Sequence, residues 1–345
     1  MNVVRWALGL AISLLGGCGL PAEVPCFSIQ ARLVEASPDD WNLRLIQSSE
    51  RSKSAGGAIV VVAVVDTGVD ENHPLLRGKL LPLLDRVGED RYSFGGRPYD
   101  YTGMDGNGHG THVSGIVGAI VGRSGVMILP VKSIPNSGVG DDRAIASGLR
   151  SAVDWRDQNM PGRRVRVINL SVGGKTRSRE LQDAIDYALS HDVLLVVSAG
   201  NDGIGVSYPA SSPGVVAVAA TNRRDQLSSY SNHGPELSLA APGGDNDDPV
   251  DSTWPTYLTA SDLRKGNSEV HQSQGMIGTS MAAPHVTGVA ALLFADAPHL
   301  SARQVKARLE SWTTDLGPIG PDPYFGTGRL NEALSLAKVG HDASE

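Results

Sequence analysis

The chain has 345 residues, of which 41% are hydrophobic and 19% charged, with 30 Lys and Arg against 37 Asp and Glu. This balance is ordinary for a globular protein and excludes disorder over most of the chain. The net charge of −7 argues against nucleic acid as a partner, because nucleic-acid-binding domains are usually basic. Both cysteines, Cys18 and Cys26, lie near the N-terminus, so the rest of the chain must fold without a disulfide.

The first seventeen residues have the pattern of an export signal. Arg5 precedes the apolar run from Trp6 to Leu15, which as a helix is about 15 Å long and too short to span a bilayer of ~30 Å. A positive charge, a short apolar run and small residues are typical of a secretory signal peptide. No apolar run long enough to span a bilayer follows, so we expect no further membrane span.

The signal ends in Leu15-Gly-Gly-Cys18, which resembles the lipobox of bacterial lipoproteins. In such proteins the cysteine is acylated and becomes the new N-terminus. The resemblance implies a signal peptide at 1–17, lipidation of Cys18 and a tether at 18–40. It also implies an exported protein, anchored to a membrane and facing the periplasm or the cell exterior. An ordinary signal cleaved nearby and a Cys18–Cys26 disulfide remain as alternatives.

From residue 58 onward, strand and helix patterns alternate. Strands are predicted at 58–65, which is an unbroken apolar run, and at 126–132, 165–171, 193–199 and 215–221. Helices are predicted at 109–121, 142–157, 179–191, 280–295 and 301–312, the last with a capping box of Ser301 and Gln304. Strands that are apolar throughout and separated by helices indicate a doubly wound α/β fold, with helices on both faces of a parallel sheet.

One polar stretch, 244–275, interrupts this alternation and is predicted to be a surface insertion. It contains acidic residues at 245, 247, 248 and 251. A solvated loop is the simpler interpretation of these carboxylates, and a calcium site is the alternative.

Polar residues follow the predicted strands where a parallel sheet places its sites. Asp66 ends the first strand, and Asn201 comes shortly after the fourth. His109 and Ser280 each stand at the start of a predicted helix. A serine needs a base to take its proton, a histidine can be that base, and a buried carboxylate can hold the imidazole. An asparagine amide can donate to the oxyanion that forms.

The order Asp66, His109, Ser280 is the one that subtilisin has among serine hydrolases. Three segments, VAVVDTGVD, GNGHGTHVSG and GTSMAAPHVTG, resemble the aspartate, histidine and serine motifs of the subtilisin-like serine proteases. INLSVGG and SAGND resemble the substrate-strand and oxyanion-asparagine segments of that family. The likeness runs from about residue 41 to 338, which leaves 339–345 as a tail.

The resemblance implies one catalytic domain with a mainly parallel, seven-stranded sheet. It implies four catalytic residues: Asp66, His109, Ser280 and Asn201. It also implies that the substrate backbone pairs with Ser171, Val172 and Gly173. Ala199 and Gly200 belong to the same substrate-binding set. The expected activity is that of a monomeric endopeptidase that cleaves peptide or protein substrates through an acyl-enzyme. The alternative is a peptide-binding module on the same fold that no longer cleaves.

Other chemistries fit the sequence less well. His109 and His112 form an H-x-x-H pair, which suggests a zinc site. The Glu of the H-E-x-x-H zinc motif is missing, however, and the chain has no cysteine after Cys26. We therefore interpret His112, and likewise His285, as packed core histidines. The segment Gly278–Ala282 nearly matches the G-x-S-x-G elbow of the α/β-hydrolases, but it ends in Ala and the triad order is different.

Two departures from the family pattern shape the expectations about cofactors and activation. Many subtilases have a calcium loop within or just after the histidine helix, whereas here Val121 is followed almost at once by the strand at 126–132. We therefore expect no cofactor, and calcium remains only as the alternative already given for 245–251. Little sequence precedes Trp41, so there is little room for a folded inhibitory prodomain.

Overall fold

The structure is a computed structural model that describes residues 26–29, 32–34, 40–48, 58–160 and 162–337, the first two ranges by their backbone alone. The predicted signal peptide, Cys18 and the C-terminal tail lie outside the described residues. Among the residues that are described, no helix is both long and apolar enough to cross a membrane.

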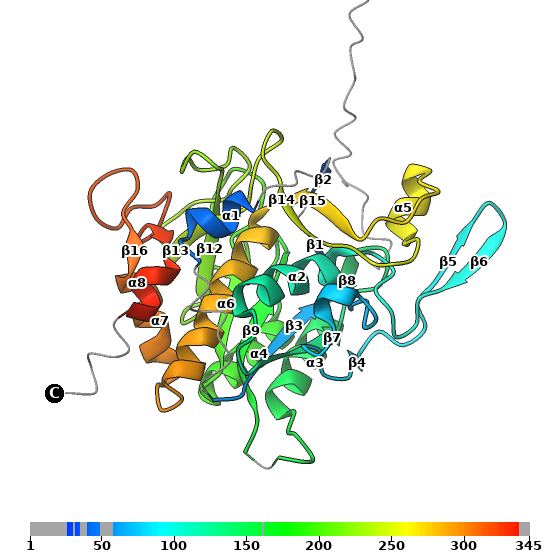
Figure 1. The fold of residues 1–345 in the computed structure, drawn as a ribbon, viewed down its shortest axis with the longest axis horizontal. Helices are drawn as coiled ribbons and strands as arrows, with labels where there is room; N and C mark the ends of the chain where they lie inside the picture. Colours follow the sequence, from blue (N-terminus) through cyan, green and yellow to red (C-terminus); the bar gives the residue numbers. More distant parts are fainter. Residues whose placement is uncertain (1–25, 30–31, 35–39, 49–57, 161, 338–345) are drawn as a thin grey trace, which may run out of the picture.

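The centre of the fold is a nine-stranded sheet (Figure 1). Its order is β16 (Thr313–Thr314), β17 (Arg329–Leu330), β13 (Leu239–Pro242), β12 (Val216–Thr221), β11 (Leu194–Ser198), β9 (Val165–Leu170), β3 (Val60–Asp66), β7 (Val126–Lys132) and β4 (Leu84–Asp85). Only the β16–β17 pair is antiparallel. The mainly parallel, doubly wound sheet is therefore confirmed. It has nine strands where the resemblance implied seven, and three of the nine, β4, β16 and β17, are only two residues long.

Helices cover both faces of the sheet, and the alternating side chains of β3 separate the two cores. Val60, Val62 and Val64 face the core that contains residues of α2 (His109–Val121), α6 (Thr279–Asp296) and α7 (Ala302–Ser311). Val61, Ala63 and Val65 face the core of α3 (Asp142–Asp154) and α4 (Arg179–Ser190). A strand buried on both faces has to be apolar throughout, which explains the unbroken run from Val60 to Val65, whereas Ile59, just before the strand, is exposed.

Most predicted boundaries agree closely with the structure. Helix α2 and strand β7 begin and end at the predicted residues. The capping box of α7 is present: the Ser301 hydroxyl accepts from the Gln304 N–H at 3.2 Å, and the Gln304 side chain accepts from the Ser301 N–H at 2.8 Å. The helix predicted at 142–157 ends early, at Asp154, because Trp155 leaves the helical conformation with ψ at 134°.

The polar stretch 244–275 is not a loop laid on the surface. It contains β14 (Val250–Thr253), α5 (Ala260–Lys265) and the start of β15 (Ser273–Ile277), and Trp254 within it is buried. Its polar groups satisfy the backbone of α2: the Thr253 hydroxyl donates to the carbonyl of Thr111 at 2.7 Å. The longest exposed run within it is 264–273. The polar composition therefore reflects internal hydrogen bonds as well as solvent contact.

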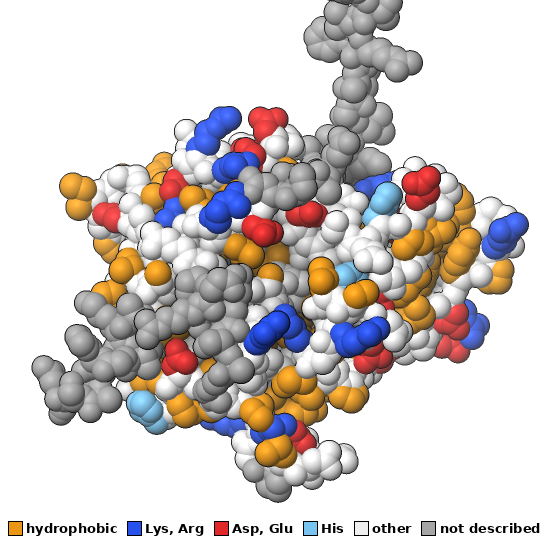
Figure 2. Space-filling view, in the orientation of Figure 1, with side chains coloured by type: hydrophobic (Ala, Val, Ile, Leu, Met, Phe, Trp, Pro, Cys, Tyr) orange, Lys and Arg blue, Asp and Glu red, His pale blue; other side chains and the backbone are white. Residues whose placement is uncertain are grey.

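Smaller elements complete the fold. They are β1 (Cys26–Ile29), β2 (Arg32–Val34), α1 (Trp41–Leu45), the 3-10 helix η1 (Pro74–Leu76), the hairpin β5 (Arg91–Phe94) and β6 (Arg97–Asp100), β8 (Val139–Asp141), β10 (Val172–Gly173) and α8 (Glu332–Ala337). The segment predicted as a tether thus contains two strands. On the face shown in Figure 2, acidic and basic side chains are interspersed, and hydrophobic side chains gather towards the β5–β6 hairpin.

Candidate active site

The predicted site residues lie at the carboxyl edge of the sheet. Strand β3 has β7 on one side and β9 on the other, so the chain order reverses beside it. Such a switch point is where open α/β sheets place their sites. Asp66 is the last residue of β3, and Ser171 directly follows β9. The fold therefore brings the ends of these strands to one place.

Asp66 and His109 are in direct contact. The Nδ1 atom of His109 lies 2.7 Å from the Oδ1 atom of Asp66, and both side chains are fully buried. The same carboxylate oxygen accepts from the backbone N–H of Thr67 at 2.7 Å. This pairing fixes the ring orientation and leaves Nε2 as the nitrogen available for proton transfer.

The Nε2 atom of His109 is buried and has no hydrogen-bond partner among the described residues. Buried polar atoms are nearly always paired, so an unpaired imidazole nitrogen needs an explanation. A role of His109 Nε2 in exchanging a proton with a bound ligand would explain why it has no partner in the protein.

Ser280 stands at the start of α6, which packs beside α2. A Cβ built on Gly288 of α6 would lie 2.8 Å from the side chain of Ile120 of α2. Helix α2 begins beside Asp66, at the end of β3, and α6 begins beside Ser171, at the end of β9, so both helices begin at the same edge of the sheet. The site side chains of His109 and Ser280 are therefore presented from neighbouring helix N-termini, where unpaired backbone N–H groups favour negative charge.

Two further contacts tie Ser280 to the neighbouring strand ends. The Ser171 hydroxyl donates to the Ser280 carbonyl at 3.1 Å, and the Ser280 hydroxyl lies 3.4 Å from the Ser171 carbonyl. Ser171 itself accepts from Asn169 at 2.9 Å. The segment Ser171–Gly173 is thus held directly against the start of α6.

Asn201 is oriented by the residue before Ser280. Its Oδ1 atom accepts from the N–H of Thr279 at 2.8 Å and from the Thr279 hydroxyl at 2.9 Å. The backbone N–H of Gly200 donates to the same hydroxyl at 3.1 Å. Because the amide oxygen of Asn201 faces Thr279, its NH₂ group points away from Thr279. Ala199 and Gly200, just before Asn201 in the chain, are buried.

The sequence did not reveal the carboxylate that joins these parts. Asp105 accepts five hydrogen bonds: from the hydroxyls of Thr67 and Thr111, and from the backbone N–H groups of Asn107, Gly108 and Thr111, all at 2.7–3.1 Å. It lies four residues before His109. Asp105 therefore fixes both the turn after Asp66 and the first turn of α2.

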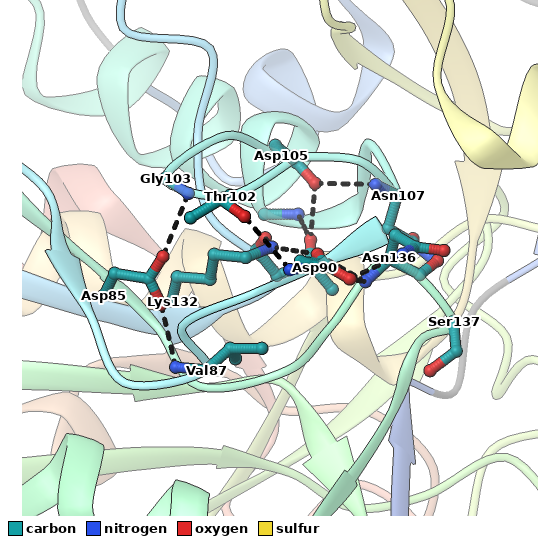
Figure 3. A network of polar contacts seen from close by, with 12 residues as sticks. Asp85, Val87, Asp90, Thr102, Gly103, Asp105, Asn107, Lys132, Asn136 and Ser137 are labelled. Carbon is teal, nitrogen blue, oxygen red and sulfur yellow. Dashed lines mark hydrogen bonds and ion pairs between the residues drawn. The ribbon is translucent and has the colours of Figure 1, made fainter. Parts of the chain in front are cut away.

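A buried ion pair supports the same region (Figure 3). Lys132, the last residue of β7, is fully buried, and its Nζ atom lies 2.8 Å from a carboxylate oxygen of Asp90 and 2.9 Å from the Thr67 carbonyl. Asp90 also accepts from the backbone N–H of Asn136 at 2.9 Å, and the Asn136 carbonyl accepts from Asn107. The network thus reaches from the turn after Asp66 to the loop before His109. A lysine at a strand end has no local pattern that predicts such burial.

The remaining histidines of the motifs are in the core. His112 is fully buried and bonded through Nε2 to the Gln274 carbonyl at 2.8 Å, and burial lowers its pKa to about 3. His285 is also fully buried, and burial lowers its pKa to about 4. Its Nδ1–H donates to the Met281 carbonyl at 2.8 Å, and its Nε2 accepts from Asn42 at 2.8 Å. Both imidazoles are neutral at pH 7, and each has a protein partner.

The described residues contain no group of three or more His, Cys, Asp and Glu side chains arranged to hold a metal ion. Two of the acidic residues near 245 make contacts of their own. Asp245 accepts from the backbone N–H groups of Asp247 and Asp248, and Asp248 pairs with Arg223 at 3.1 Å.

Comparisons with known proteins agree with this geometry. Residues 57–328 match the family model described as the subtilase family. The chain is 35% identical to thermitase of Thermoactinomyces vulgaris over 295 residues, covering 83% of this chain and 91% of that one. It is 36% identical to subtilisin DY of Bacillus licheniformis over 304 residues, covering 84% and 96%.

A solved structure, fervidolysin from Fervidobacterium pennivorans, a keratinolytic enzyme related to subtilisin, superimposes with a TM-score of 0.72 at 28% identity. The match covers 90% of this chain and 51% of fervidolysin, so this chain corresponds to about half of that one. Both the family model and the relatives span most of the described residues, and the chain belongs to the subtilase family of serine endopeptidases.

Proposed function

We propose that Ser280, His109 and Asp66 form the catalytic triad of this endopeptidase. The observation that carries the proposal is the 2.7 Å contact between Asp66 and His109, with the Nε2 atom of His109 unpaired. Asp66 holds the imidazole in one tautomer and stabilises the imidazolium that forms during the reaction.

In the reaction, the Ser280 oxygen attacks the carbonyl carbon of the scissile peptide bond, and His109 Nε2 takes the hydroxyl proton. The tetrahedral intermediate collapses to an acyl-enzyme, and His109 gives its proton to the departing amine. Water then attacks the acyl group, again with His109 as the base, and Ser280 is released.

Asn201 and the backbone N–H of Ser280 would hold the oxyanion. The contact of Asn201 with Thr279 supports this role, because it leaves the amide NH₂ group as the arm that can donate. Ser171, Val172 and Gly173 would pair with the substrate backbone, and Ala199 and Gly200 would line the same cleft. The substrate class is thus an extended peptide or protein segment.

Kinetics on a peptide substrate test these roles. Ser280→Ala should lower kcat by several orders of magnitude and leave the melting temperature unchanged within a few degrees. Asn201→Ala should cost about 10²–10³ in kcat, a magnitude taken from subtilisin itself and therefore borrowed here. A chain that binds peptides without cleaving them would show no turnover for these substitutions to remove, and the complete set of four polar groups argues against it.

We further propose export and a lipid anchor at Cys18, which rests on the sequence alone. The chain should then partition with membranes and incorporate labelled fatty acid, since each buried CH₂ of an acyl chain contributes about 0.8 kcal/mol. Cys18→Ser should abolish both properties, whereas the matched control Cys26→Ser should retain them. Soluble, unmodified protein from the unsubstituted chain would refute the anchor.

A further inference from the structure

A polar side chain lies on the face of β9 that is turned towards α6. Asn169 is fully buried, and it shares this face with Val167, which belongs to the core that contains α2 and α6. Buried polar groups need hydrogen-bond partners, because an unpaired group is costly in a medium of low dielectric constant. The amide NH₂ group of Asn169 donates to the Ser171 hydroxyl at 2.9 Å, and its amide oxygen accepts from the Thr287 hydroxyl at 2.9 Å. The amide therefore joins Ser171 to α6.

The contacts continue to the backbone of the proposed nucleophile. The Ser171 hydroxyl donates to the Ser280 carbonyl at 3.1 Å. In an α-helix this carbonyl would accept from the N–H of the residue four positions later. That residue is Pro284, and proline has no N–H. The Ser171 hydroxyl therefore takes the place of the missing helical donor and ties the first turn of α6 to the end of β9.

The chemistry of the four groups fixes the direction of each bond in this chain of contacts. A carbonyl only accepts, so the Ser171 hydroxyl uses its single proton on Ser280. Ser171 can then only accept from Asn169, which places the NH₂ group on that side and the amide oxygen towards Thr287. The Thr287 hydroxyl must in turn donate to this oxygen. Bonds that all run in one direction polarise and strengthen one another, so we expect a single arrangement of the four residues.

Both ends of this hydrogen-bond chain lie on α6. Ser280 and Thr287 are seven positions apart, which is close to two turns of about 3.6 residues, so they lie on the same face of the helix. Asn169 and Ser171, at the end of β9, bridge the interval between them. All four residues are fully buried, so bulk water does not compete for these bonds. The first two turns of α6 are therefore held at a fixed position against the sheet.

We propose that Asn169 and Thr287 are positioning residues for Ser280. The inference rests on the assignment of Ser280 as the nucleophile and adds the groups that hold it in place. By binding the Ser280 carbonyl, the hydrogen-bond chain fixes the backbone that carries the attacking oxygen. A substrate paired with Ser171–Gly173 is then placed relative to the same residue that holds Ser280. This matters because a displacement near 1 Å at a catalytic group can cost about 10²-fold in rate.

The test compares two substitutions of Thr287. Thr287→Val preserves the shape of the side chain but removes the hydroxyl donor, whereas Thr287→Ser retains the hydroxyl and removes a methyl group. The matched control is Thr221→Val, because the Thr221 hydroxyl is also buried but has no hydrogen-bond partner among the described residues. The full chain is assayed with a peptide anilide, kcat and KM are determined separately, and the melting temperature of each variant is recorded.

We expect Thr287→Val to lower kcat about five- to tenfold, since one buried hydrogen bond of the chain is lost. Thr287→Ser and Thr221→Val should stay within about twofold of the parent. KM should change by less than about threefold in every variant, because the backbone of Ser171–Gly173 is intact. Asn169→Leu breaks two bonds and should lower kcat about 10²-fold. Adding Thr287→Val to it should change kcat by less than about twofold, because both substitutions break the same chain.

A structural role alone would lower the melting temperature of the Thr287 variants and leave their kcat values equal. Equal kcat values for Thr287→Val and Thr287→Ser, with both variants folded, would therefore overturn the inference, as would a rise in KM at unchanged kcat. Either result would leave the proposed function standing if Ser280→Ala is inactive. Hydrolysis that persists in Ser280→Ala, or no hydrolysis by the parent, would instead overturn the proposed function and the inference with it.

Discussion

Thr67 and Asp105 are joined by a 2.8 Å hydrogen bond that links the turn after Asp66 to the loop before His109. The Thr67 hydroxyl also accepts from the backbone N–H of Gly110, in the first turn of α2, at 2.9 Å. The 2.7 Å contact between Asp66 and His109 is thus held by residues that take no part in it.

Asp105→Ala should destabilise the protein strongly. The substitution leaves five buried or partly buried donors without their acceptor, and each unsatisfied buried group costs about 1–3 kcal/mol. Since solvent and relaxation recover part of this cost, we expect a loss of at least about 3 kcal/mol in the free energy of unfolding, measured in urea. The control is Asp100→Ala, whose carboxylate is exposed and accepts from Thr102. A loss below about 1 kcal/mol for Asp105→Ala would contradict the account.

Lys132→Met should also be costly, because it leaves the Asp90 carboxylate buried without its cation. Breaking a buried pair by removing one partner typically costs about 3–5 kcal/mol. The matched control is Arg143→Met, which breaks an exposed pair with Glu180 of 3.8 Å and should cost under about 1 kcal/mol. Urea unfolding of both variants checks the contrast. Equal losses would show that the Lys132 network does not support the fold.

Gly110→Ala should disturb the site through sterics alone. A Cβ at this position would lie 2.2 Å from the Gly68 carbonyl oxygen and 3.2 Å from the Cβ of Asp66. We expect the helix to move away from Asp66 and kcat to fall about 10²-fold, the usual effect of a displacement near 1 Å at a catalytic group. Gly205→Ala is the control, since its Cβ meets no atom within 4 Å. Unchanged kinetics for Gly110→Ala would show that the positioning is looser than the structure indicates.

His285 predicts a loss of stability in acid. Its pKa is about 4 in the folded protein and near 6.5 in the unfolded chain, so below pH 6.5 the unfolded state binds a proton that the folded state does not. The free energy of unfolding should therefore fall by about 1.4 kcal/mol per pH unit from this residue as the pH drops from about 6.5 towards 4.

The measurement is the pH dependence of urea unfolding for the parent and two variants. His285→Gln should be less stable at pH 7, since it loses the contacts with Asn42 and Met281, but its stability should vary less with pH between 6.5 and 4. His299→Gln, at an exposed residue, should keep the slope of the parent. An unchanged slope in His285→Gln would show that this histidine does not take part in acid unfolding.

The sequence predicted the main sheet and its helices because their signal is local and repetitive. Strand β7 and helix α2 were delimited correctly, since apolar side chains recur there with the period of each element. The predicted residues Asp66 and His109 were brought together because the ends of parallel strands and the starts of the following helices share one edge of the sheet.

The supporting network could not be predicted in this way. Lys132 lies at the end of an apolar strand, where a charged residue normally marks the passage to solvent, and its partner Asp90 is far from it in the sequence. Its burial depends on two loops meeting in space. The same limit applies to β1, whose residues have no strong strand pattern and are ordered by pairing with β8 and β10.

Reaction with a fluorophosphonate probe tests the central claim most directly, because this reagent phosphonylates a serine only where a base activates it. The probe is incubated with the full chain and with Ser280→Ala, and the adduct is located by mass spectrometry of peptides. We predict one adduct, on Ser280, in the parent and none in Ser280→Ala. An adduct of equal yield in Ser280→Ala, or no adduct on Ser280 in the folded parent, would contradict the assignment of Ser280 as the nucleophile.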